Sequence, residues 1–92
     1  MTKWKSLSND LKICVRIYQE RLAGRETWAS RLTELLKDDM TRTDVSMCED
    51  KLMDLGILDK QYVKVEGKWT YCYKIESEAK SFIEGIVKHL GA

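Results

Sequence analysis

Residues 40–75 decide the fold and read MTRTDVSMCEDKLMDLGILDKQYVKVEGKWTYCYKI. In the first half of this stretch, apolar side chains recur at the spacing of a helix, whereas the second half alternates with the period of a strand. Thr41 is placed to cap the helix, Asp44 completes a capping-box pattern, and Gly56 follows the helix end. The stretch therefore predicts a capped helix and then a β-hairpin. The buried side of the helix is expected to hold Val45, Cys48, Leu52 and Leu55.

Two β-rich runs, residues 62–65 and 69–75, flank the turn-forming sequence EGK at residues 66–68. Side chains alternate between the two faces of a strand, which gives the second run an aromatic face. Residues that pair across the two strands lie on the same face. If Val63 and Val65 share the face of Trp69, Tyr71 and Tyr73, odd-numbered residues pair with odd-numbered ones, and the two numbers of each pair add up to an even value. We therefore expect a three-residue turn with Gly67 at a positive φ. The aromatic face would comprise Trp69, Tyr71, Tyr73 and Ile75, and its opposite Thr70, Cys72 and Lys74.

This aromatic face has two interpretations. Aromatic rings on a sheet can stack on the bases of a single-stranded nucleic acid. Packing in the core is the interpretation we favour, because Trp69, Tyr71 and Tyr73 have the same parity as Ile75.

Residues 9–22 predict a first helix that is capped by Ser8 or Asn9. Its apolar arc is too wide for one partner surface, so we expect neighbours on two sides. The side chains left for water would be Lys12, Arg16, Gln19 and Glu20.

Two more helices are expected on either side of the opening stretch. Residues 27–37 predict a second helix with Thr27 as its cap, and Arg25 and Glu26 before it are expected to be strand-like. Residues 76–90 predict a last helix, whose apolar stripe runs to the end of the chain.

This order of elements is that of a winged helix-turn-helix domain. Residues 40–46 (MTRTDVS) and 51–58 (KLMDLGIL) resemble the recognition helix and exit turn of MarR-like and related archaeal winged-helix transcription regulators. The link before this helix is longer and more acidic than in the family and lacks its usual glycine. The resemblance implies one α+β, mainly helical domain over residues 1–92. It would have a three-helix core, a β-hairpin wing at about 60–75 and a C-terminal dimerisation helix at about 76–90.

The resemblance also implies a DNA-binding transcriptional regulator in an archaeal cytoplasm, with double-stranded DNA as its partner. The third helix would enter the major groove, and the wing would lie on the phosphate backbone. Lysines on an exposed hairpin also discourage edge pairing, and that interpretation stays open. The implied contacts are Arg42, Thr43, Ser46 and Met47 for the bases, and Lys64, Lys68 and Lys74 for the phosphates.

An alternative follows from the acidic character of the third helix. Asp50 and Asp54 share its outward arc, where DNA phosphates would repel them. A winged helix used as a protein-protein interaction module would instead dock a basic partner through this helix.

A homodimer is expected from the unusual length of the apolar stripe in the last helix and from the wide arc of the first. Two-fold dimers are the commonest oligomers, and family members usually dimerise through their terminal helices. The alternative is a monomer whose last helix closes the core. The expected interface comprises Trp4, Ile13, Ile17, Phe82, Ile83, Ile86, Val87 and Leu90.

The formal net charge of the 92 residues is only +1, but the charge is unevenly divided. Residues 26–59 hold four basic and nine acidic side chains, whereas residues 60–75 hold four lysines and one glutamate. This division moves the expected DNA contact toward the wing.

The sequence contains no motif that indicates another class of function. No nucleophile with a base, glycine-rich phosphate loop or metal-ligand spacing is present, so we expect no enzyme, no metal and no cofactor. Apolar runs are too short for a membrane span, and a polar start predicts no signal peptide. The three cysteines are expected to be small buried hydrophobes, with a redox-sensing thiol as the alternative.

Overall fold

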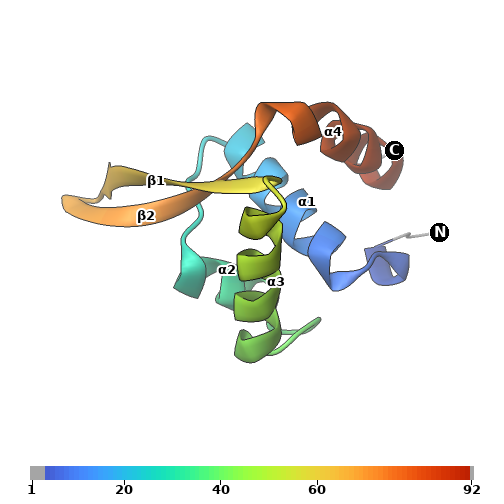
Figure 1. Ribbon diagram of the computed structural model, residues 1–92, viewed down its shortest axis with the longest axis horizontal. Helices are drawn as coiled ribbons and strands as arrows, with labels where there is room; N and C mark the ends of the chain where they lie inside the picture. Colours follow the sequence, from blue (N-terminus) through green and yellow to red (C-terminus); the bar gives the residue numbers. More distant parts are fainter. Residues whose placement is uncertain (1–3, 92) are drawn as a thin grey trace.

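The structure, a computed structural model, describes residues 4–91. Its described part contains four α-helices and a two-stranded antiparallel sheet, which confirms the expected α+β, mainly helical class. Figure 1 shows the hairpin projecting to one side of the helices, with α4 next to α1. The elements are a 3-10 helix η1 (Trp4–Ser6), α1 (Asn9–Leu22), α2 (Ala29–Leu35), α3 (Arg42–Asp54), β1 (Leu58–Val65), β2 (Lys68–Ile75) and α4 (Ser77–Gly91).

Helix α1 forms the centre of the core, because α2, α3, α4 and β2 all pack against it. The hydroxyl oxygen of Ser8 accepts a hydrogen bond from the backbone N–H of Leu11 at 3.3 Å and so caps the helix. The expectation of neighbours on two sides is confirmed by the almost complete burial of Ile13, Cys14, Val15 and Ile17.

Two side chains of α1 that were expected to face water are buried. Lys12 is 8% exposed and Glu20 is 5% exposed. Lys12 reaches Asp39 at 3.5 Å, and Glu20 accepts hydrogen bonds from Arg25 and Arg31. The prediction was wrong for these two residues because partners from elsewhere in the chain satisfy their charges.

Helix α3 begins as its sequence predicts. The Thr41 hydroxyl accepts from the backbone N–H of Asp44, and the Asp44 carboxylate accepts from that of Thr41, each at 3.1 Å. Val45 and Leu52 lie in the core. Leu55, expected to be buried, is 65% exposed because it follows the last helical residue, where the chain turns away toward β1.

The segment before α2 differs from its prediction. Thr27 does not cap the helix, which begins at Ala29 after Trp28. Instead Thr27 is 1% exposed, and its carbonyl oxygen accepts a hydrogen bond from the backbone N–H of Tyr73 at 2.8 Å. The structure assigns no strand at Arg25 and Glu26. This one backbone hydrogen bond attaches the segment to β2.

The hairpin closes through a two-residue turn, which overturns the predicted register. Val65 pairs with Lys68, and Tyr62 pairs with Tyr71, so paired numbers sum to an odd value. Gly67 has the predicted positive φ, +83°, but Glu66 also takes φ 50°. Two successive left-handed residues make the tight turn whose twist matches that of the strands. Lys60, Tyr62 and Lys64 therefore share the face of Trp69 and Tyr71, and the valines take the other.

Candidate nucleic-acid interface

The four residues of α3 that were expected to contact bases lie together on its surface. Arg42, Thr43, Ser46 and Met47 are all exposed, and they occupy the N-terminal half of the helix. Among the described residues, Arg42 has no ion pair, so its charge is available to a ligand. The exposed carboxylates Asp50 and Asp54 lie in the C-terminal half of the helix, and Asp50 is one turn from Ser46 and Met47 on the same face.

Two polar contacts fix α3 against its neighbours. The Lys51 ammonium lies 2.7 Å from the Asp10 carboxylate at the start of α1, which takes this cation away from the outer face. On the buried side, the Tyr73 hydroxyl of β2 donates a hydrogen bond to the Glu49 carboxylate at 3.0 Å. The hairpin base and α3 are thus held in one geometry.

Glu49 is an unusual residue for this position, since its carboxylate is charged in water but only 4% exposed here. Burial raises its pKa from 4.5 to about 7, although the Tyr73 hydrogen bond and the Lys60 charge act in the opposite direction. Its second carboxylate oxygen is buried without a hydrogen-bond partner in the described part of the chain. The group therefore titrates near neutral pH.

The three wing lysines do not form one group. Lys64 and Lys68 are exposed beside the turn of the hairpin, whereas Lys74 is half-buried at its base. Lys64 pairs with Trp69 and therefore lies on the aromatic face, whereas Lys74 lies on the opposite face. The cation that joins Lys64 on this face is Lys60, which the sequence-based site omitted.

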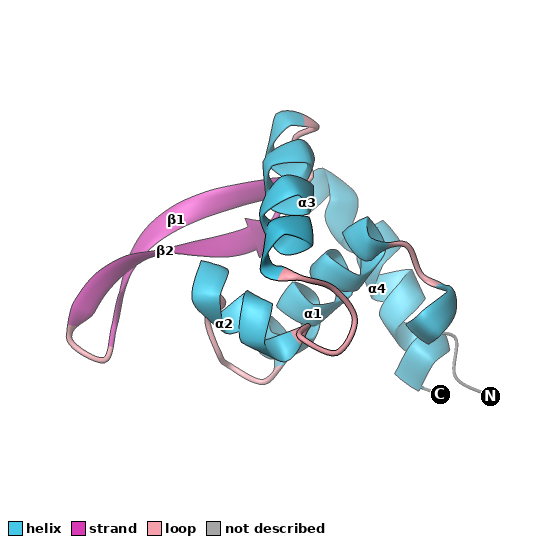
Figure 2. Ribbon diagram, turned by 90° about the horizontal axis from the view of Figure 1, so that it is seen from below, coloured by secondary structure: helices cyan, strands magenta, loops and turns pink. Residues whose placement is uncertain are grey.

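The outer part of the aromatic face is exposed, so the prediction of core packing is wrong for two of three aromatic residues. Tyr73 is 6% exposed, but Trp69 and Tyr71 are each 58% exposed, as is Tyr62 of β1. The alternation of side chains along a strand correctly places these rings on one face of the hairpin. It does not show how much of that face the helices cover. Figures 1 and 2 show that the hairpin tip extends beyond the helices.

The expected dimer residues divide into two sets. Ile13, Ile17 and Ile83 are at most 1% exposed in the core of this one chain. Trp4 packs against the same core, and its indole N–H donates to Asp39 at 3.1 Å. On α4, Phe82 is 64% exposed, while Ile86, Val87 and Leu90 are partly buried. The surface left for a second chain is Phe82 with the outer parts of Ile86, Val87 and Leu90.

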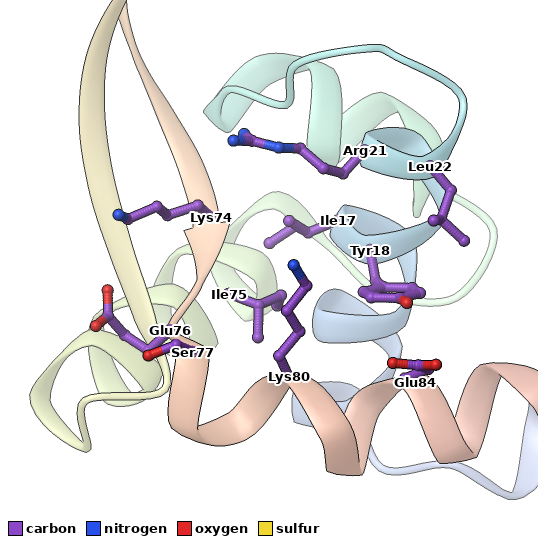
Figure 3. Close-up of a pocket in the computed structure, with 10 residues that line it drawn as sticks. All are labelled: Ile17, Tyr18, Arg21, Leu22, Lys74, Ile75, Glu76, Ser77, Lys80 and Glu84. Atoms are coloured by element: carbon purple, nitrogen blue, oxygen red, sulfur yellow. The ribbon is translucent and has the colours of Figure 1, made fainter.

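A hollow of about 530 Å³, which the sequence did not indicate, lies between α1, the end of β2 and the start of α4 (Figure 3). Three basic and two acidic side chains line it, so it carries charges of both signs. Its walls come from residues 17–22 and 74–84, two segments distant in sequence, which is why no local motif predicts it. The charged lining residues are Arg21, Lys74, Lys80, Glu76 and Glu84.

The three cysteines are unpaired thiols, and burial raises the pKa of each. For Cys14 the pKa rises to about 12 and for Cys48 to about 11, so both stay protonated at neutral pH. Across residues 4–91, no cluster of three or more His, Cys, Asp or Glu side chains is arranged to hold a metal ion. None of the described helices is long and apolar enough to span a membrane.

Comparison with known proteins adds no assignment: no family model, no curated protein and no solved structure matches the chain.

Proposed function

We propose that the chain is a winged-helix transcriptional regulator that binds double-stranded DNA as a homodimer, with the N-terminal half of α3 in the major groove. The observation that carries the proposal is the surface formed by Arg42, Thr43, Ser46 and Met47, which offers a free cation and hydrogen-bonding groups. The N-terminal part of a recognition helix is the part that usually contacts base edges. Lys64 and Lys68 on the projecting hairpin supply phosphate contacts.

Wing and helix variants should have different effects on binding to duplex DNA. Each phosphate contact that releases a counterion contributes roughly tenfold in affinity at about 0.1 M salt. Reversing Lys64 and Lys68 to Glu is therefore expected to weaken binding to all duplexes by about 50-fold or more. Arg42→Ala or Ser46→Ala should instead change which sequences are preferred, by about 5- to 100-fold at one position.

Anisotropy titrations against a pool of random duplexes and a selected duplex provide the measurement. Lys5→Glu with Lys37→Glu is the matched control, because it makes the same charge change at exposed positions outside α3, the hairpin and α4. Equal losses from this control pair and the wing pair would contradict the assigned surface.

The dimer has its own expected result. Light scattering should give the wild-type chain a mass near twice 10.8 kDa, and Phe82→Lys should bring it to 10.8 kDa. The exposed Phe82 ring has apolar area to bury against a second chain, and a lysine there would place a charge in the contact. Lys88→Ala on the same helix is the control. A wild-type mass of 10.8 kDa at all concentrations would overturn the dimer.

One observation favours a second candidate, a protein-interaction module. Asp50 and Asp54 are exposed on α3, and a basic protein surface would complement them better than a phosphate backbone. Failure to bind any duplex at low salt would favour this candidate. Asp50→Lys should then abolish partner binding, whereas the proposed regulator would bind DNA more tightly after the same change.

A further inference from the structure

The outer half of the hairpin carries a cluster of aromatic side chains that the proposed function does not use. The face that includes Leu58, Tyr73 and Ile75 packs into the core at its base, where Tyr73 bonds to Glu49 of α3. Toward the turn the same face continues beyond the helices (Figures 1 and 2). Three large aromatic rings on this outer part are each 58% exposed.

These three rings form a cluster. Tyr62 lies between Trp69, with ring centroids 5.5 Å apart and planes within 22°, and Tyr71, with centroids 4.8 Å apart. Mutual contact across the strand pair limits the rotamers of each ring. The cluster therefore presents aromatic surface that is already ordered before any ligand binds, which lowers the entropic cost of binding.

Lysines lie at both ends of the cluster on the same face. The Lys60 ammonium lies 5.8 Å from the centre of the Tyr71 ring, and Lys64 is paired directly with Trp69. Lys68 lies at the turn but on the opposite face, because it pairs with Val65. Within residues 4–91, neither Lys60 nor Lys64 forms an ion pair, although the Lys60 charge acts on the buried Glu49, and both side chains are exposed to an anionic ligand.

Aromatic rings between unpaired cations complement one chemistry above others, a chain of bases joined by phosphates. We infer that the outer hairpin face, built from Lys60, Tyr62, Lys64, Trp69 and Tyr71, binds an unpaired strand of DNA or RNA by stacking bases on its rings. The strand must be unpaired, because the faces of bases in a duplex are already covered by their neighbours. This site shares Lys64 with the proposed duplex interface but differs from it in using the aromatic rings of the sheet face and not α3.

Two other occupants fit the surface less well. A second protein chain would bury apolar area, but the lysines interrupt this face at each end and would lose their hydration. A lipid surface favours lysines and tryptophan, yet its binding strength scales with buried apolar area, and two of these three rings carry a polar hydroxyl.

The test is binding of a labelled oligothymidylate and a labelled oligouridylate, followed by anisotropy at low and at moderate salt. The 92-residue chain should bind both, more weakly as salt rises. Trp69→Leu, which keeps apolar bulk but removes the ring, should weaken binding by about 5- to 100-fold. Trp69→Phe keeps a ring and should remain within about threefold of the wild type. Because position 69 is largely exposed, both variants should fold, and circular dichroism checks this.

A spectroscopic signal separates stacking from an indirect effect. Oligonucleotide binding should quench tryptophan emission in the wild type but not in Trp69→Phe, because Trp4 and Trp28 are half-buried and lie outside the hairpin. Arg42→Ala should leave single-strand binding unchanged, so failure of the α3 proposal and of this one can be told apart. The inference would be overturned by wild-type-like binding of Trp69→Leu, by no binding at low salt, or by binding to anionic vesicles alone.

Discussion

Replacing Glu20 by Gln is expected to lower the free energy of unfolding by about 2–3 kcal/mol at pH 7. The Glu20 carboxylate is 6% exposed and joins three segments of the chain. Arg25 donates two hydrogen bonds to it at 3.0 Å each from the loop after α1, and Arg31 of α2 donates a third. Glutamine fits the same space but leaves both guanidinium groups without a counter-charge.

The pKa of Glu20 shows the size of this effect. The two hydrogen bonds from Arg25, and then the one from Arg31, lower this pKa from 4.5 to about 2 against the opposing effect of burial. Each pKa unit corresponds to about 1.4 kcal/mol, and we reduce the total because the Arg25 side chain is 56% exposed to water. The stabilisation is complete above pH 4.5 and is lost as the pH falls toward 2.

Urea denaturation at a series of pH values measures this prediction. Wild type and Glu20→Gln should differ most at neutral pH and converge in acid. The control is Glu26→Gln, whose partner Arg21 is half exposed, so its loss should cost less than about 1 kcal/mol. Equal effects of the two substitutions would show that the buried ion pair does not stabilise the loop.

Replacing Glu49 by Gln is expected to do the opposite and stabilise the protein by about 2–3 kcal/mol at pH 8. Because burial raises the pKa of Glu49 to about 7, the folded state binds a proton that the unfolded state has released. The stability of the wild type should therefore fall as the pH rises from 4.5 to 7 and then level off. Glutamine stays neutral and can still accept the hydrogen bond from Tyr73.

The same denaturation series at pH 5 and pH 8 tests this result. Glu49→Gln should nearly match the wild type at pH 5 and exceed it at pH 8, whereas the exposed neighbour Asp50→Asn should change little at either. A destabilised Glu49→Gln at pH 8 would mean that the carboxylate is ionised at a net benefit, contrary to its burial.

Much of the fold follows from local patterns. The 3.6-residue period locates α1, α3 and α4, and Thr41 with Asp44 marks the start of α3 to the residue. Helical spacing also places Arg42, Thr43, Ser46 and Met47 on one exposed face, as the structure has them. These features depend on neighbouring residues alone, which a sequence contains in full.

The features that the sequence did not predict depend on distant residues or on rare conformations. Glu66 takes a left-handed φ that a glutamate seldom adopts, and this one residue changes the register of the whole hairpin. Glu20 and Glu49 are buried because Arg31 and Tyr73 reach them across the fold. The exposure of Trp69 depends on where the helices end, which alternation along a strand does not show.

The salt dependence of duplex binding tests the central claim most directly. With Arg42, Lys64 and Lys68 as phosphate or groove contacts, the logarithm of the binding constant should fall against the logarithm of salt concentration with a slope of about −2.7 per protomer and about −5.4 for a dimer. The Lys64→Glu, Lys68→Glu pair should make that slope shallower by about two units per protomer. No binding to duplex DNA at low salt, or a slope near zero, would contradict the assignment of α3 and the wing as a DNA-binding surface.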